Sequence, residues 1–176
     1  MSVTKTLLTG LALLAVLSAG ADAQDTAANN VRLTFQIVEA DGFQEADPAI
    51  TEIVDELRQL FRFEGYRLLD TSVLRGVADD DWNRVQQRLA LKDYGTVEIE
   101  ALIQATSAPG VARIAVTLRD ATGEFYSDGR LRPGPAVMDV SVNVRNGQTV
   151  VLGSGRPNNA GGAIILVMTA EIEPNP

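Results

Sequence analysis

The sequence predicts an α+β domain in which one long amphipathic helix packs on a mainly antiparallel β-sheet or sandwich of seven or eight strands. Three observations lead to this prediction. Most segments alternate apolar and polar residues, which is the period of a strand with one buried face. One segment repeats apolar residues every three or four positions, which is the period of a helix. Turn-forming residues, such as Asn146-Gly147, separate the segments at short intervals.

The first segment, Met1–Ala23, has the pattern of a secretory signal peptide. A basic start precedes an apolar run from Leu7 to Gly20, and Ala21-Asp22-Ala23 matches the A-x-A cleavage pattern. The run is short for a membrane span, which needs about 20 apolar residues, and an uncleaved N-terminal anchor is the alternative. We therefore expect a periplasmic or extracellular protein with no direct membrane span after cleavage. Residues 24–30 are predicted to be a flexible tether, and residues 31–176 a single β-rich domain.

Residues 31–75 predict a β-α-β opening. Val31–Val38 alternates apolar and polar residues and predicts a strand, and Tyr66–Leu74 predicts a second. Between them, Asp47-Pro48 suits the start of a helix, because Asp is a good cap and Pro fits the first helical position. The predicted helix then carries one apolar stripe along its length. The stripe consists of Ile50, Ile53, Val54, Leu57, Leu60 and Phe61.

Residues 82–173 predict antiparallel strands joined by short turns. Asn83–Leu91 fits a helix or a strand, and the strand is favoured because Tyr94-Gly95 then makes a hairpin turn. Asn146-Gly147 is the strongest hairpin signal in the chain. Further strands are predicted at residues 96–105, 111–119, 137–144, 148–152 and 163–172, with turns and loops at 120–123, 128–135 and 153–162.

Composition limits the chemistry available to this chain. The formal net charge is −8, which disfavours nucleic acid as a partner. The absence of His and Cys removes the commonest general base, the usual zinc ligands and the thiol nucleophile. We therefore expect no enzyme, no catalytic residues, no cofactor and no metal site. The alternatives are a carboxylate-only enzyme using Asp41, Glu45 and Asp47, and a calcium site at Asp79-Asp80-Asp81, for which a solvated turn is favoured.

Four residues beside polar breaks are candidates for a partner interface. Trp82, Phe125 and Tyr126 suit an interface if they are exposed, and they fill a core if they are buried. Arg156 follows Gly153-Ser154-Gly155, which superficially resembles a phosphate-binding loop. That motif requires a third Gly and a following helix, which are missing here, so a hairpin loop is favoured. Arg156 could still hold an anionic group.

The segment Val137–Glu171 resembles the end of the β-domain of bacterial secretins, the outer-membrane ring proteins of type II and type III secretion and of type IV pili. Val140–Ser154 carries the family's strand, N-G turn and Q-T-V-V-L-G-G pattern, with Ser154 in place of the last Gly. Ala163–Ile172 corresponds to its last apolar strand. The resemblance implies a secretin-like strand arrangement and a role in an envelope assembly. It implies neither a pore nor catalytic residues.

These observations together predict an exported, non-enzymatic domain that acts through protein-protein contacts. Its partners are expected in the cell envelope or in a membrane complex, of which the chain would be an accessory subunit. The alternative prediction is a small-ligand carrier with a pocket between the helix and the sheet.

Overall fold

The computed structural model describes residues 29–41, 47–122, 125–127, 130–157 and 162–174. The predicted signal peptide, Met1–Ala23, lies outside the described residues, as does most of the predicted tether. Asn29 and Asn30, at the end of that tether, already belong to the first strand and pair with the last one. The folded domain therefore begins slightly earlier than the alternation of apolar residues indicates.

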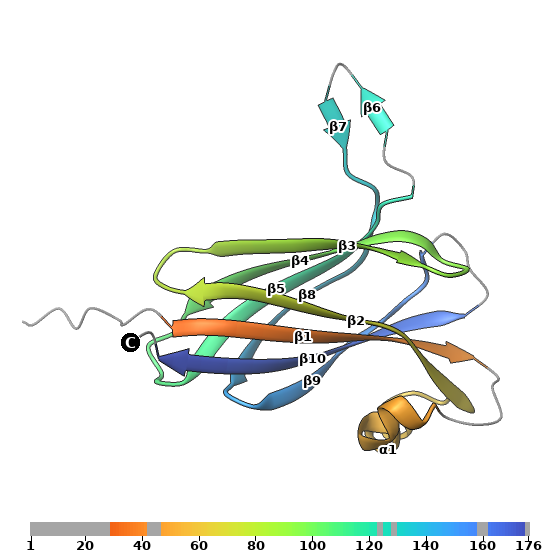
Figure 1. The fold of residues 1–176 in the computed structure, drawn as a ribbon, viewed down its shortest axis with the longest axis horizontal. Coiled ribbons are helices and arrows are strands. Elements are labelled where there is room, and N and C mark those ends of the chain that lie inside the picture. The colour runs from red at the N-terminus through yellow and green to blue at the C-terminus, as the bar shows by residue number, and fades with distance from the viewer. Residues whose placement is uncertain (1–28, 42–46, 123–124, 128–129, 158–161, 175–176) are drawn as a thin grey trace, which may run out of the picture.

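Two four-stranded antiparallel sheets pack face to face, so the predicted mainly antiparallel sandwich is confirmed (Figure 1). The segment Asn83–Leu91 is a strand, as favoured. Sheet A has the order β2 (Gly65–Ala78), β1 (Asn29–Asp41), β10 (Ala163–Pro174) and β9 (Gln148–Gly155). Sheet B has the order β3 (Asn83–Leu91), β4 (Gly95–Ala105), β5 (Val111–Asp120) and β8 (Ala136–Arg145).

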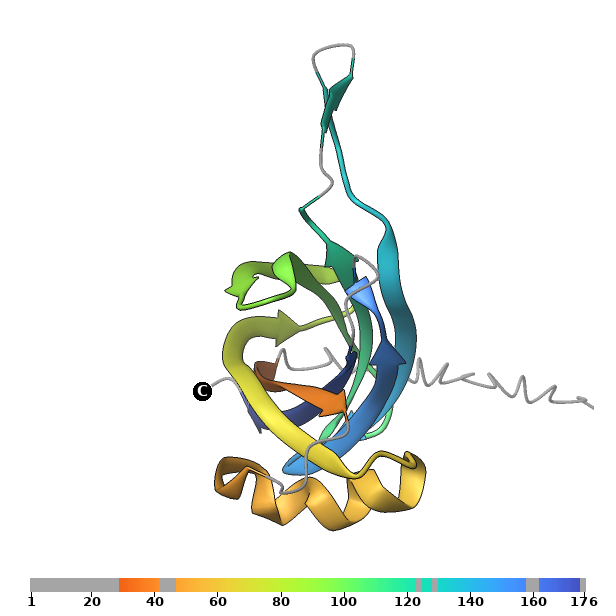
Figure 2. The ribbon, with the colours of Figure 1, turned by 90° about the vertical axis from the view of Figure 1, so that its right-hand side faces the viewer.

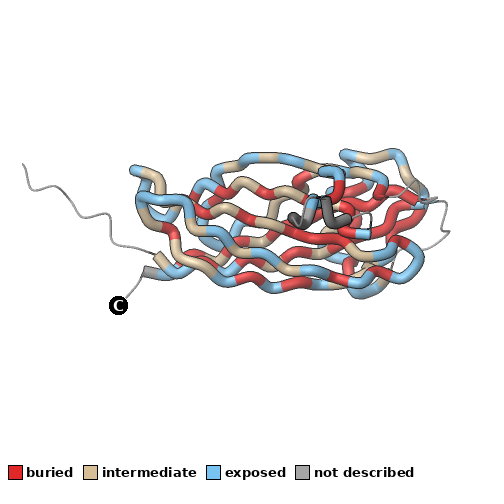
Figure 3. The backbone as a smooth tube through the Cα atoms, turned by 90° about the horizontal axis from the view of Figure 1, so that it is seen from above, coloured by how far each residue is buried: buried red, intermediate tan, exposed pale blue. Residues whose placement is uncertain are grey.

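The main hydrophobic core fills the space between the two sheets. Alternate residues of β1 point into it, including Leu33, Phe35 and Ile37, and they meet inward-facing residues of sheet B such as Ile99 and Ile114. Figure 3 shows this alternation of buried and exposed positions along the strands. Burial of these side chains supplies most of the stabilising free energy, since each contributes about 1.5–3 kcal/mol.

A short helical segment covers part of the outer face of sheet A (Figure 2). It consists of a 3-10 turn, η1 (Pro48–Ile50), and the helix α1 (Thr51–Leu60). The Asp47 side chain caps it as predicted, accepting a hydrogen bond of 2.9 Å from the Ala49 N–H. A second apolar cluster lies between the helix and the sheet. Its buried members are Val38, Ala40, Ile50, Val54, Leu57, Tyr66, Ile165 and Val167.

The prediction of one long helix is wrong, because the helix is ten residues long and the domain is mostly β. Leu60, predicted to belong to the apolar stripe, is 58% exposed. Phe61 leaves the helix in an extended conformation, and its N–H makes the closing bond to the Leu57 carbonyl. The helix ends there because the chain must return to pair with β1 from Gly65 onward.

The β-α-β opening has the predicted order of elements, but its two strands run antiparallel. β1 and β2 are neighbours in sheet A and pair from Asn29↔Ala78 to Asp41↔Gly65, with a shift in register between Ile37 and Val38. A parallel crossover would require a helix long enough to carry the chain back along the sheet. The short α1 instead lies within the connection between two antiparallel neighbours.

Asn146-Gly147 does not close a two-stranded hairpin, contrary to the prediction. β8 pairs with β5 and β9 pairs with β10, so this turn carries the chain from sheet B to sheet A. Gly147 has a φ of 75°, whereas Asn146 lies outside the left-handed region that a type I′ hairpin turn requires. The Asn146 Oδ1 instead accepts a 2.8 Å hydrogen bond from the Ile172 N–H. This bond attaches the turn between β8 and β9 to the end of β10.

The predicted loop at residues 153–162 begins later than expected, because Gly153, Ser154 and Gly155 extend β9. Gly155 explains this extension. A Cβ at Gly155 would lie 2.9 Å from the Val137 carbonyl oxygen, so the missing side chain lets β9 approach β8 closely. The two sheets therefore nearly meet along this edge although the two strands do not pair.

A short hairpin between β5 and β8 projects away from the sandwich (Figures 1 and 2). It consists of β6 (Phe125–Ser127) and β7 (Arg130–Arg132), which pair with each other from Phe125↔Arg132 to Ser127↔Arg130. We call this hairpin the arm. The turn and loop predicted here did not include its strands, because three-residue strands are too short to show an alternating pattern.

Candidate functional site

Backbone hydrogen bonds hold the base of the arm against the sandwich. The Asp120 N–H donates to the Pro135 carbonyl at 3.0 Å, which joins the two chain segments that enter and leave the arm. The Ala121 N–H donates to the Thr96 carbonyl at 2.8 Å, and the Thr96 N–H donates to the Thr122 hydroxyl at 2.9 Å. The arm is therefore fixed at its base to the start of β4.

Gly134 allows the two segments at the base to approach each other. A Cβ at Gly134 would overlap the backbone carbonyl of Asp120, so only glycine fits this position. The Asp120 side chain is buried and accepts a 2.9 Å hydrogen bond from the Thr122 N–H. The base of the arm is therefore packed as closely as a protein core, although the arm itself projects away from the core.

A polar network of two buried residues and the exposed Arg67 lies near the base of the arm, at the β3–β4 turn. Glu39 in β1 is 7% exposed, and its Oε1 accepts a 2.7 Å hydrogen bond from the hydroxyl of the buried Tyr94. Its Oε2 accepts a 2.9 Å bond from Nε of Arg67 in β2, and the guanidinium also pairs with it through a terminal nitrogen. Sheet A is thereby joined to the turn that supports the arm.

Tyr94 stays protonated throughout the neutral range. Burial raises the pKa of its hydroxyl, and the hydrogen bond to Glu39 and the negative charge of that carboxylate raise it further. Arg67 lowers the pKa by a smaller amount. A Cβ at Gly162 would overlap the Tyr94 hydroxyl, so this glycine leaves room for the Tyr94–Glu39 contact. The network therefore has a structural role. It joins β1 and β2 to the β3–β4 turn, and Tyr94 serves as a hydrogen-bond donor.

The structure separates the four predicted interface residues. Trp82 follows the end of β2, where β1 begins and β10 ends, and it is 42% exposed. Phe125 and Tyr126 form part of β6 in the arm, and their side chains lie outside the described part of the structure. Arg156 is exposed and follows Gly155, which contacts Val137 just beyond the arm. Only the last three residues therefore lie at the same end of the sandwich.

The other candidates from the sequence have structural roles. Asp47 caps the helical segment and also accepts a bond from the Leu68 N–H, while Glu45 lies outside the described residues. Asp79 Oδ1 accepts a 3.1 Å bond from the Asp81 N–H, which closes the favoured turn.

Among the residues that the structure describes, no group of three or more carboxylates is placed to hold a metal ion. In the same residues, no helix is long and apolar enough to cross a membrane.

The space between helix and sheet bears on the predicted ligand carrier. Apolar side chains of the second cluster, including Val54, Leu57 and Tyr66, fill the interface. A groove of about 250 Å³ lies at its edge, lined by Thr34, Gln36, Ala49, Ile50, Glu52, Ile53, Thr149, Thr169 and Glu171. This is below the usual range of about 300–1,000 Å³ for ligand sites. The carrier stays a prediction that the packing does not favour.

No protein-family model, curated protein or solved structure matches this chain. The secretin resemblance of Val137–Glu171 therefore stays a prediction. The strands on either side of its N-G turn lie in different sheets.

The sequence of the arm region contains a weak hairpin signal. Asp128-Gly129 is a turn dipeptide, and it has three strand-forming residues before it and Arg130–Arg132 after it. The buried Glu39–Tyr94 pair had no comparable signal, because the two residues are far apart in the chain and each follows an ordinary pattern. Only the packing of β1 against the β3–β4 turn brings them together.

Proposed function

We propose that this chain is an exported, non-enzymatic domain that binds a protein partner in the cell envelope through the arm. One observation carries the proposal: β6 and β7 form a hairpin outside both sheets, and its base is fixed by hydrogen bonds and by the close approach at Gly134. A fixed base limits the region that the arm can reach and so reduces the entropy lost when a partner binds.

The arm's composition suits a protein contact. An isolated two-stranded hairpin is marginally stable in water, and a partner would supply the burial that it lacks. Three of its six strand residues are the apolar or aromatic Phe125, Tyr126 and Leu131, and two are Arg130 and Arg132. Aromatic and arginine residues are enriched in protein interfaces and dominate their binding energy.

Each arm strand also has an edge that a partner strand could use. In the described part of the chain, β6 and β7 pair only with each other. Addition of a strand to such an edge is a common mode of recognition, in which backbone hydrogen bonds give affinity. The envelope location is supported by the signal-peptide pattern of Met1–Ala23 and by the secretin resemblance.

Replacement of residues 123–133 by Asn-Gly tests this proposal. The variant keeps the pairing of Asp120 with Pro135 and should fold, with an unchanged circular dichroism spectrum and a melting temperature within about 5 °C of wild type. We expect the full chain, purified from solubilised envelopes, to carry a partner of defined mass in native mass spectrometry, and the variant to lose it. Gln86→Ala, an exposed change on β3, should retain the partner. The proposal would be contradicted if the full chain and the variant without the arm recovered the partner equally. It would also be contradicted if the full chain carried no partner.

A further inference from the structure

A row of planar side chains crosses the outer face of sheet B, at the end opposite the base of the arm. Gln104 in β4 is in register with Arg113 in β5, and Arg113 is in register with Asn143 in β8. Asn83 pairs with Ile103, so continuing that register places Trp82 beside Gln104. Because neighbouring strands lie about 4.8 Å apart, the row extends over about 15 Å.

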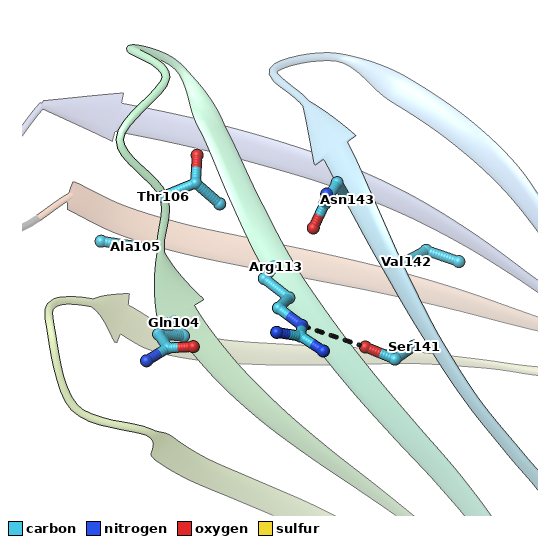
Figure 4. Close-up of a pocket in the computed structure, with 7 residues that line it drawn as sticks. All are labelled: Gln104, Ala105, Thr106, Arg113, Ser141, Val142 and Asn143. Atoms are coloured by element: carbon cyan, nitrogen blue, oxygen red, sulfur yellow. Dashed lines mark hydrogen bonds between the residues drawn. The ribbon is translucent and has the colours of Figure 1, made fainter.

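Three of the four residues in the row, Gln104, Arg113 and Asn143, line an open cavity of about 390 Å³ (Figure 4). Its volume lies within the range of small-ligand sites. Its only charged side chain is that of Arg113, and the other polar groups are amides and hydroxyls. The lining residues are Gln104, Ala105, Thr106, Arg113, Ser141, Val142 and Asn143.

Two side chains of the row are held in place by their neighbours. The Arg113 guanidinium carbon lies 5.7 Å from the centroid of the Trp82 ring, within cation–π distance. Its Nε donates a long hydrogen bond of 3.5 Å to the Ser141 hydroxyl. The Gln104 Nε2 donates to the Asp80 carbonyl at 2.9 Å, which leaves the Gln104 Oε1 directed as an acceptor. Groups oriented before binding lose less entropy when a ligand arrives.

We propose that this row binds a neutral carbohydrate chain. Amide and guanidinium groups present hydrogen-bonding atoms in one plane, side by side, and so match two neighbouring hydroxyls of a sugar ring. The Ser141 hydroxyl lies beside them in the same cavity, whereas the Thr106 hydroxyl is already hydrogen-bonded to the backbone of Ala108 and Val111. The partly exposed indole of Trp82 offers an apolar surface to the C–H groups of the sugar. The regular spacing of the row suits an extended chain of similar units.

Other ligand classes fit less well. A polyanion would meet Asp79, Asp80 and Asp81 directly beside Gln104, on a chain whose net charge is −8. A tight protein interface needs a central aromatic anchor enclosed in a water-free pocket, whereas this site is open and Trp82 lies at its margin. A neutral ligand with many hydroxyl groups agrees with both observations.

Trp82 is the only tryptophan in the chain, so intrinsic fluorescence reports on this site directly. The probes are two neutral hexasaccharides, cellohexaose and chitohexaose, and an acidic oligogalacturonate of the same length. We expect at least one neutral probe to shift the emission saturably and to bind more tightly than the acidic one. Gln104→Ala and Asn143→Ala should each weaken that binding about five- to tenfold, the effect of losing about one hydrogen bond.

Gln86→Ala is the matched control, because Gln86 is an exposed amide on the same face of sheet B, in register with Glu100 and outside the cavity. It should bind as wild type does. Circular dichroism confirms that each variant is folded. The proposal is overturned if neither neutral probe gives a saturable shift, if the acidic probe binds more tightly, or if Gln104→Ala and Asn143→Ala bind as wild type. Because the arm is not part of this site, failure here leaves the proposed protein contact intact.

Discussion

Tyr94→Phe tests whether the buried polar network holds the two sheets together at the β3–β4 turn. The change removes one hydroxyl and leaves the Glu39 carboxylate with Arg67 as its remaining side-chain partner among the contacts described above. A buried hydrogen bond to a charged acceptor contributes about 1.5–3 kcal/mol. We therefore expect a loss of about 2 kcal/mol in the free energy of unfolding and a fall of about 5 °C in the melting temperature.

Tyr66→Phe provides the matched control. Tyr66 is also fully buried, but its hydroxyl donates to the backbone carbonyls of Leu57 and Phe61, at 3.1 and 3.0 Å. Both acceptors are neutral, so the expected loss is about 1 kcal/mol. Urea denaturation followed by circular dichroism measures both values. Equal losses for the two variants, or a loss below about 0.5 kcal/mol for Tyr94→Phe, would refute the argument that the charged acceptor matters.

The pH dependence gives a second readout of the same network. The pKa of Tyr94 is raised in the folded protein, chiefly by burial and also by Glu39, so the unfolded chain loses this proton first as the pH rises past about 10. The folded state then binds more protons than the unfolded state, and stability must fall with rising pH, by up to about 1.4 kcal/mol per pH unit for one group. Burial raises the pKa of Tyr66 in the same direction. Tyr94→Phe should therefore flatten the decline above pH 10 without abolishing it, and an unchanged slope would contradict the assignment.

Two further predictions concern packing. Leu57 is fully buried on the side of the helix that faces sheet A, whereas Leu60 is mostly exposed. Leu57→Asp should therefore prevent folding, at a cost of at least about 5 kcal/mol, while Leu60→Asp should change stability by less than about 0.5 kcal/mol. Circular dichroism distinguishes the two variants, and a folded Leu57→Asp protein would show that the helix contributes little. Gly134→Ala should destabilise the protein by about 3 kcal/mol, because its Cβ would overlap the Asp120 carbonyl; a melting temperature equal to that of wild type would show that the base of the arm is loosely packed.

The strands of the sandwich were largely predictable from local pattern. β1, β4 and β5 each alternate buried residues with more accessible ones over most of their length. Their predicted bounds differ from the observed ones by at most three residues at either end. This succeeded because one face of each strand packs in the core, which imposes a period of two on the sequence.

Strand pairing was less predictable than the strands themselves. Asn146-Gly147 carries a strong local signal for a hairpin, yet β8 and β9 pair with β5 and β10 instead. The turn residues determine that the chain reverses, but long-range contacts determine which strands meet. The helix was overestimated for a related reason, since Leu60 continues the apolar period without having a surface to cover.

The candidate sites depended on tertiary structure even more. Trp82 was identified from its position beside a polar break, but its partner Arg113 lies on β5 and reaches it only through the sheet. The row that contains Gln104 and Asn143 depends on the register of four strands, which no local pattern encodes.

Site-specific photo-crosslinking tests directly whether the arm contacts a protein partner. A photoreactive amino acid replaces Tyr126 in the arm in one protein and Gln86 on sheet B in another, and both are irradiated in intact cells. We expect a covalent product of one defined mass from position 126 and none of that mass from position 86. The absence of any product from position 126, or the same product from both positions, would contradict a role of the arm in binding a partner.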